Sequence, residues 1–422
     1  MPDAAAAAQV TARLEAALSA VDRAALARDV AAAVRVPSVT GDERPVLELL
    51  GAQARALGLE ARLVQENLAA LERQPRYPGR EAPRSELWNL VVALPGSDPD
   101  AGRLALCGHV DVVTPGTERW SRDPFSGELS DGRVWGRGST DMKGGVVAAL
   151  HALAALRATG GAPASLELLA VSSEEDGGLG AFAALERDAA YDACLIPEPT
   201  ELAVVCAQAG ALTFTGTLRG RGAHAAVRLE GCSAIDRYVP LHAALHAHEQ
   251  RINAAVAHPL MRRLPLPYPI VVGRLEAGLW SSQVPDRLVF EGRLGVRVGE
   301  SPEAARAGLE AALREADDGA GPPVELRWSG GQFSSGETAV DDPFVLLVQA
   351  SLAAETGGDA PLAGVPYGAD MRLFCERGIP TVMAGARGLA RAHAVDEWAD
   401  IDELTHVARM IVRVALGFRR RS

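Results

Sequence analysis

Residues 103–113, RLALCGHVDVV, join a short apolar run to a histidine and an aspartate. The run is typical of a buried β-strand, and His109 and Asp111 follow as it ends. Two further apolar runs, 166–171 and 193–196, are also followed within three residues by acidic residues. Because helical patterns separate these runs, the sequence predicts an α/β fold with a mostly parallel sheet and helices on both of its faces. In such sheets ligands bind beyond the carboxyl ends of the strands.

A set of acidic residues and two histidines follows the apolar runs or precedes a helix. The set comprises His109, Asp111, Asp141, Glu174, Glu175, Glu198 and His393. If its five carboxylates converge, burial and mutual repulsion raise several of their pKa values. Two divalent cations nearly cancel five negative charges, so the set predicts a metal site. For each residue alone the alternative is a helix cap or a solvated loop, but the complete set favours the metal site.

Length, composition and charge narrow the classes of function. A chain of 422 residues predicts two domains, or one large domain with an insertion. Its hydrophobic content of 48% and charged content of 23% are typical of a soluble globular protein. The net charge of −12 argues against non-specific binding to nucleic acid or to anionic membranes, which need a basic face. We therefore expect a small-molecule partner, and neither nucleic acid nor a membrane.

The ends of the chain and the cysteines show no targeting or redox motif. Charged residues interrupt the alanine-rich N-terminal segment, so it lacks the apolar core of a secretory signal, and we expect a cytoplasmic protein. Residues 404–418 contain three basic residues and fall short of the roughly 20 residues that span a membrane. We expect a helix packed on the domain there. The five cysteines form no CxxC pair and are expected to be core residues.

The sequence pattern changes between residues 208 and 327. Strands punctuated by glycine surround two expected helices in this segment. We expect it to be an inserted α+β lid domain, with residues 1–207 and 328–422 forming the metal-binding catalytic domain. Before the first strands, residues 65–86 are polar and rich in proline and glycine, which predicts a surface excursion.

One basic residue has an unusual place. Lys143 is the only lysine of the chain, and it lies in the segment Asp-Met-Lys-Gly-Gly that begins at Asp141. Lysine carries a compact charge on a flexible stem, whereas arginine carries a planar fork. We expect Lys143 to support this loop and the start of the next helix without touching substrate.

The motifs occur together and in the same order in one family of metallohydrolases. They are Gly108-His109-Val110-Asp111-Val112, GRGSTDMKGG at 136–145, Glu174-Glu175, Glu198-Pro199-Thr200 and Ala392-His393. Over nearly its whole length the chain resembles the co-catalytic zinc aminoacylase, carboxypeptidase G and acetylornithine deacetylase or succinyl-diaminopimelate desuccinylase family. The resemblance implies a metal-dependent hydrolase whose inserted lid domain forms a homodimer.

The resemblance also implies how two metal ions are held. Asp141 would bridge them. His109 and Glu198 would complete one site, and Glu175 and His393 would complete the other. Nitrogen and carboxylate donors of this kind suit zinc, with cobalt and manganese as alternatives.

Two further residues receive catalytic roles from the resemblance. Glu174 would act as the general base that takes a proton from water. Asp111 would hydrogen-bond the far nitrogen of His109, which fixes the tautomer of the imidazole.

Substrate binding is less fully indicated by the family pattern. His224 resembles a lid histidine that reaches an active site, in dimers usually the partner's, and it would stabilise the tetrahedral oxyanion. Arg372 resembles the deacetylase pattern and would bind a substrate carboxylate. The chain departs from the family at Ser282-Gln283, where many members have an asparagine, and at Arg293-Leu294-Gly295, where they have Asp-x-Arg. The lid arginine that would bind a substrate carboxylate is therefore missing from its usual place.

A second pair of histidines is a rival metal site. His242 and His246 have the i, i+4 spacing of a helix face. No glutamate lies between them as in the HExxH motif, so we interpret them as part of a solvated helix surface.

The leading expectation is an amidohydrolase that removes a small acyl group from an N-acyl amino acid or amine through a metal-bridged water. A dipeptidase or carboxypeptidase that uses the same metals is the second hypothesis. A non-catalytic metal-binding protein of this fold is the third, and the presence of Asp111 and Glu174 argues against it.

Overall fold

The computed structural model describes residues 4–420, with side chains from residue 9 onward. A nine-stranded sheet forms its centre, in the order β1-β2-β6-β3-β7-β15-β8-β13, with β14 beside β8. The strands are β1 Glu60–Gln65, β2 Trp88–Leu94, β3 Arg103–His109, β6 Ser165–Val171, β7 Ala193–Ile196, β8 Val204–Gln208, β13 Gly336–Glu337, β14 Leu362–Val365 and β15 Thr381–Met383. The four central strands β6, β3, β7 and β15 run parallel, while β2 and β8 pair with them antiparallel.

Helices cover both faces of this sheet, as predicted. The chain passes from β3 to β6 through α5 (Gly144–Ala158), and from β6 to β7 through α6 (Leu179–Arg187). These two connections run in opposite directions across the sheet. Because such crossovers are right-handed, they place α5 and α6 on opposite faces. The remaining helices of this part are α1 Ala4–Ser19, α2 Arg23–Arg35, α3 Arg44–Ala56, α4 Leu68–Leu71, α9 Pro343–Thr356, α10 Met371–Cys375 and α11 Ile401–Gly417.

Helix α5 is buried on nearly all sides, because the sheet and helix α11 both cover it. Its sequence is accordingly alanine, valine and leucine all round, without the polar face of a surface helix. The last helix, α11, has a polar side, on which Arg409 and Arg413 both pair with Glu355 of α9. None of the described helices combines the length and the apolarity needed to cross a membrane.

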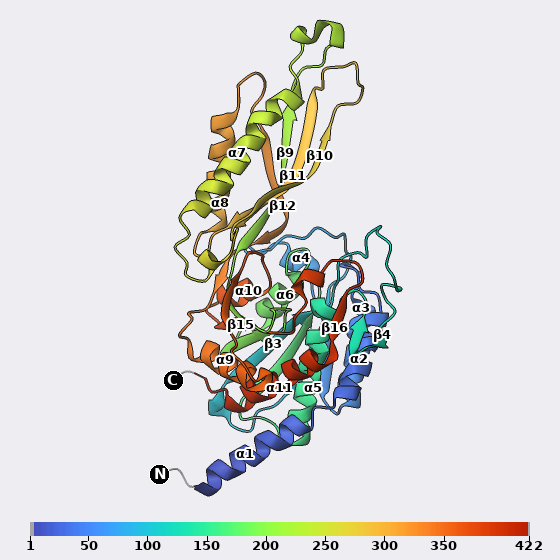
Figure 1. The fold of residues 1–422 in the computed structure, drawn as a ribbon, viewed down its shortest axis with the longest axis vertical. Coiled ribbons are helices and arrows are strands. Elements are labelled where there is room, and N and C mark those ends of the chain that lie inside the picture. The colour runs from blue at the N-terminus through green and yellow to red at the C-terminus, as the bar shows by residue number, and fades with distance from the viewer. Residues whose placement is uncertain (1–3, 421–422) are drawn as a thin grey trace.

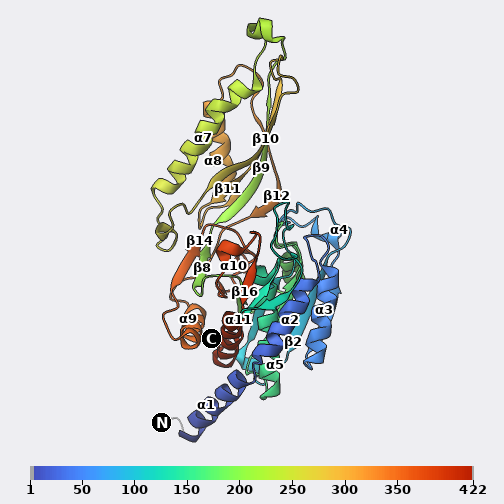
Figure 2. The same cartoon turned by 45° about the vertical axis from the view of Figure 1, so that its right-hand side comes forward.

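A second sheet lies beyond the first along the long axis of the molecule (Figures 1 and 2). Its four antiparallel strands have the order β10-β11-β9-β12. Their bounds are β9 Gly210–Arg219, β10 Ile270–Ala277, β11 Arg287–Val296 and β12 Glu325–Phe333, and the helices α7 Ala234–Ala254 and α8 Pro302–Ala316 pack on one face of the sheet. Ser233 and Ser301 cap these helices and accept hydrogen bonds from Asp236 N (3.1 Å) and Ala304 N (3.2 Å).

This second unit, which we call the lid, has a hydrophobic core of its own. This core contains the fully buried residues Phe214, Phe290 and Leu309, which do not belong to the larger core around α5. The separate core supports the expected inserted domain, while the exact boundaries at 207/208 and 327/328 stay a prediction. Strand β12 continues past the expected boundary at residue 327.

A small third sheet completes the fold. Its strands are β4 (Glu128–Ser130), β5 (Arg133–Trp135) and β16 (Trp398–Asp400).

Candidate metal centre

The strand ends bring the predicted metal ligands together. His109 is the last residue of β3, and Glu174 and Glu198 lie just beyond the ends of β6 and β7. Asp141 lies in the kinked turn that leads into α5, and His393 in the loop after β15. Since the neighbouring strands are parallel, these loops meet at one edge of the sheet.

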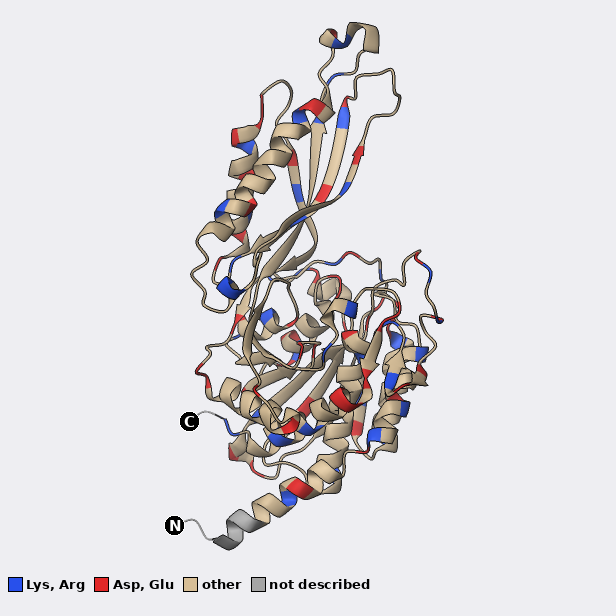
Figure 3. Ribbon diagram, in the orientation of Figure 1, with Lys and Arg blue, Asp and Glu red and all other residues tan. Residues whose placement is uncertain are grey.

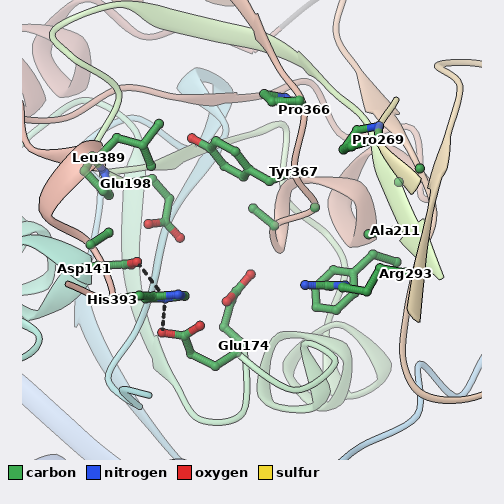
Figure 4. Close-up of a pocket in the computed structure, with 18 of the residues that line it drawn as sticks. Asp141, Glu174, Glu198, Ala211, Pro269, Arg293, Pro366, Tyr367, Leu389 and His393 are labelled. Carbon is green, nitrogen blue, oxygen red and sulfur yellow. Dashed lines mark hydrogen bonds and ion pairs between the residues drawn. The ribbon is translucent and has the colours of Figure 1, made fainter. Parts of the chain in front are cut away.

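The carboxylate of Asp141 lies between the two histidines. Its Oδ1 atom is 3.0 Å from Nε2 of His109, and its Oδ2 atom is 3.4 Å from Nε2 of His393. Glu198 Oε1 lies 3.7 Å from His109 Nε2, and Glu175 Oε1 lies 3.1 Å from His393 Nε2. The arrangement yields two sets of three donors that share one carboxylate. Figure 4 shows Asp141, Glu198 and His393 of this cluster at the cavity. Donor atoms of His109, Asp141 and Glu175 also lie within 4.8 Å of one another.

The electrostatics of this cluster fit divalent cations. Burial raises the pKa of both Glu174 and Glu198 well above the ordinary value, and nearby carboxylates add to the rise. For His393, hydrogen bonds with Asp141 and then Glu175 raise the pKa to about 10. Without cations, so many buried acids can be accommodated only by holding protons. Imidazole nitrogens and carboxylate oxygens in two adjoining sets are donors that zinc, cobalt and manganese accept.

Asp111 holds the turn of Glu174 and Glu175 and the ring of His109 in position. Its carboxylate accepts hydrogen bonds from the backbone nitrogens of Glu174 (3.1 Å) and Glu175 (3.2 Å) and from the Thr40 hydroxyl (3.0 Å). The far nitrogen of His109 lies 2.9 Å from the backbone carbonyl of Asp111, whereas the carboxylate is 3.6 Å away. The carbonyl thus provides the hydrogen bond that we expected from the carboxylate. An Nδ1–H that donates to this carbonyl leaves Nε2 free to bind a metal.

A cavity of about 390 Å³ opens beside the cluster, between the catalytic sheet and the lid. Asp141, Glu174, Glu175, Glu198 and His393 line its catalytic side. The lid contributes mostly apolar residues and one arginine, namely Ala211, Pro269, Val271, Arg293 and Phe333, and Tyr367 lies between the two sides (Figure 4). A site that combines convergent acids with an apolar wall has the character of a small-molecule active site.

A comparison with families of known proteins matches residues 105–417 to the family described as Peptidase family M20/M25/M40. The chain belongs to this family. Membership confirms the resemblance in the sequence, and it makes the chain a metallohydrolase with the cluster around Asp141 as its candidate metal site.

Individual relatives agree with this assignment. The chain is 30% identical over 411 residues to a succinyl-diaminopimelate desuccinylase of Rhodospirillum centenum, an alignment that covers 93% of this chain and 96% of the relative. Its fold is similar to that of a dipeptidase of Saccharomyces cerevisiae, with a TM-score of 0.74, 15% identity and coverage of 96% and 98%. A dinuclear metal-binding peptidase of this family from Bacillus subtilis has a TM-score of 0.65, 14% identity and coverage of 94% and 98%.

Two residues expected to bind substrate do not line the cavity. His224 directly precedes the short helix Ala225–Glu230, which lies at the end of the lid farthest from the catalytic sheet (Figure 1). Arg372 is only 1% exposed, and its guanidinium donates to the backbone carbonyl of Gly177 (2.7 Å). The expectation that Arg372 binds a substrate carboxylate does not fit this placement, because its charge lies inside the protein.

The other basic residues singled out in the sequence, His242, His246 and Lys143, lie outside the cavity. The rings of His242 and His246 lie 4.6 Å apart on the exposed side of α7, away from the acidic cluster. Lys143 is fully buried, and its Nζ donates to the carbonyls of Ala33 (3.2 Å) and Val36 (2.9 Å) at the end of α2. Burial lowers the pKa of Lys143 to about 7. It therefore supports the loop, as predicted, by fixing it to a helix end.

A buried ion pair that we did not predict holds two of the predicted ligands, Asp141 and His393. Arg137 and Glu397 lie 2.8 Å apart, and both are at most 2% exposed. The other oxygen of Glu397 accepts hydrogen bonds from the backbone nitrogens of Gly138, Thr140 and Asp141, at 2.9 to 3.2 Å. Arg137 also donates to the carbonyl of His393 (3.1 Å). One ion pair thus fixes the loops of both residues. The sequence indicated it only by an acidic residue four positions after His393, the predicted ligand.

The segment 65–86 is more than the surface excursion that its composition predicted. The side chain of Arg84 is completely buried and pairs with Glu43 at 2.9 Å. Asp176, which follows the two glutamates of the site, accepts hydrogen bonds from the backbone nitrogens of Glu81 (3.1 Å) and Ala82 (2.8 Å). The segment therefore braces the loop that carries Glu174.

Removing one member of the buried ion pair is predicted to destabilise the protein strongly. Glu397→Leu leaves Arg137 charged and buried without its partner, which typically costs about 3–5 kcal/mol. Urea unfolding of metal-stripped protein measures the loss. The double variant Arg137→Leu with Glu397→Leu removes both charges and should be more stable than Glu397→Leu alone. A double variant that is as unstable as the sum of the single variants would contradict the pairing.

Proposed function

We propose that this M20/M25/M40 hydrolase cleaves the amide bond of an N-acyl amino acid or a small N-acyl amine. The observation that carries the proposal is Glu174, a buried carboxylate that lines the cavity beside both donor sets. Among the described residues no basic side chain lies within ion-pair distance of it, so it is available for proton transfer. The desuccinylase name of the Rhodospirillum relative supports an acyl group as the part removed.

Two zinc ions are the proposed cofactors. Asp141 would bridge them, with His109 and Glu198 on one ion and Glu175 and His393 on the other. The distances from Asp141 to the two imidazoles, one from each oxygen, support this division. When bound, the ions would lower the pKa of a shared water to about 7 and polarise the amide carbonyl.

Glu174 is the proposed general base. Burial raises its pKa above the ordinary value, which makes its carboxylate a stronger base. With cations bound it can be ionised, and it would then take a proton from water and pass it to the nitrogen of the leaving amine. The hydrogen bonds from the backbone of Glu174 and Glu175 to Asp111 fix the turn in which these neighbours diverge. One carboxylate can then bind metal while the other faces the substrate.

We also propose a homodimer formed through the lid. Strand β10 is an unpaired edge of its sheet, and Leu275 on it is 49% exposed. Val239 on α7 is 63% exposed, and Trp280 at the lid end is 72% exposed. An unpaired strand edge can pair with a second chain, and exposed apolar residues nearby would add buried area to such an interface. A dimer would also explain His224, which lies outside the cavity of its own chain and would serve the cavity of the partner.

The expected location and the expected absence of other partners stay predictions. Acidic and basic residues alternate over the visible elements and do not gather on one of them (Figure 3). The net charge of −12 supports a chain that binds neither nucleic acid nor an anionic membrane. Fractionation of the source cells would test the proposed cytoplasmic location.

A panel of amides tests the proposed reaction. Zinc-supplemented protein should hydrolyse N-acetyl, N-formyl or N-succinyl amines or amino acids faster than dipeptides. The release of free amine from each compound is the measurement. Faster cleavage of dipeptides would favour the dipeptidase alternative, and no turnover of any amide, with zinc, cobalt or manganese, would contradict the proposal.

Two variants should separate metal binding from proton transfer. Glu174→Ala is predicted to keep its metal content and to lose turnover by roughly 10²–10⁴-fold, the usual contribution of a general base. His393→Ala is the matched comparison, and it should lose metal because it removes a donor. Metal analysis and turnover are measured on both proteins. Retained turnover in Glu174→Ala, or unchanged metal content in His393→Ala, would overturn the assigned roles.

Subunit mixing tests the proposed role of His224. If this histidine serves the partner's cavity, a mixed dimer of Glu174→Ala and His224→Ala chains has one complete site. Co-expression of the two variants should therefore restore turnover to a substantial fraction of the wild-type rate, although each variant alone is poorly active. A mixture no more active than its components, with a mixed dimer shown by native mass spectrometry, would exclude action from the partner.

A further inference from the structure

The cavity contains one lysine or arginine side chain among its lining residues, and this is Arg293 on the lid strand β11. Figure 4 shows its guanidinium pointing into the cavity from the side opposite Asp141 and His393, with Glu174 between them. In the part of the chain that the structure describes, no carboxylate lies within ion-pair distance of it. The ring centre of Phe333 lies 5.7 Å from its guanidinium carbon. The charge of Arg293 is therefore positioned but not neutralised.

The lid sheet has room for a long side chain at position 293 of strand β11 but not at position 295. Residues 293 and 295 share a face of β11, because side chains alternate along a strand. At Gly295 a Cβ atom would lie 2.7 Å from the backbone carbonyl carbon of Tyr268, so the structure has no room for a side chain there. Arg293, paired with Val271 of β10 and Thr213 of β9, is the next position on that face.

The surroundings of Arg293 make it a binding group rather than a structural one. Its strand neighbour Val271 and the nearby Ala211 and Pro269 are apolar and line the same wall. The acids occupy the opposite wall and are directed at the candidate metal site. A guanidinium that faces a cavity of this kind is suited to a planar anion, which it binds with two parallel hydrogen bonds.

We propose that Arg293 binds a carboxylate of the substrate, so that the enzyme prefers amides with a carboxylate on the lid side of the scissile bond. This inference rests on the proposed amidohydrolase function. The carboxylate belongs either to the acyl group or to the amine portion, and in both cases its charge orients the substrate with the amide toward the donor cluster. Arg293 takes the part for which the sequence had indicated Arg372.

Matched pairs of compounds test the proposal. An N-succinyl alkylamine is compared with its neutral N-succinamoyl analogue, and an N-acetyl amino acid with its N-acetyl amino acid amide. Arg293→Gln should lower kcat/KM roughly tenfold to hundredfold for the charged member of one pair and change the neutral member by less than about threefold. The pair that responds shows which side of the amide carries the carboxylate. Arg293→Lys should restore part of the loss.

Arg287→Gln is the control variant, because Arg287 lies on the same strand but outside the cavity. It should leave both members of each pair unchanged. Equal losses for charged and neutral compounds in Arg293→Gln, or equal effects of the two variants, would overturn the proposal.

Binding measurements separate failure of this inference from failure of the proposed reaction. Calorimetry with zinc-loaded protein should show that Arg293→Gln weakens binding of the charged compounds about tenfold more than binding of the neutral ones. This result stands even if no amide is turned over, in which case only the proposed reaction fails. Equal affinities in wild type and Arg293→Gln would contradict the role of Arg293 whatever the turnover.

Discussion

The site depends on the position of one carboxylate between two imidazoles. Asp141 presents one oxygen to His109 and the other to His393, and each imidazole has a further glutamate beside it. The cluster carries more negative charge than a protein interior tolerates without cations or bound protons. Metal binding is therefore the condition under which these acids can all be ionised, and the cavity, Glu174 and the lid are arranged around the cluster.

Buried polar contacts outside the cluster make this arrangement rigid. The ion pair of Arg137 with Glu397 joins the loop of Asp141 to that of His393, and Asp111 holds the turn of the two glutamates. Buried ionic groups contribute little net stability, since their desolvation offsets their attraction. When their hydrogen bonds are complete they fix geometry. His393 has a φ of 62°, a conformation rare for residues other than glycine, and the bond from Arg137 to its carbonyl helps to hold it.

The sequence was sufficient for the features that follow from periodicity and strand ends. Apolar runs predicted β3, β6 and β7, and the residues just after them predicted the donor cluster. Side-chain direction in the loops was harder to predict. Arg372 matched a motif but lies inside the protein, and Arg293 attracted attention only as a departure from the family pattern although it lines the cavity. Which face of a lid strand meets the catalytic sheet depends on long-range packing, and no local pattern records it. Glu397 escaped notice for the same reason, since its partner is 260 residues away.

Diffraction from crystals of zinc-supplemented protein, measured at the zinc absorption edge, tests the central claim most directly. The account predicts two anomalous peaks roughly 3.5–4 Å apart, with one oxygen of Asp141 about 2.0–2.2 Å from each, His109 on one ion and His393 on the other. Both histidines on a single ion, or no ion in contact with Asp141, would contradict it.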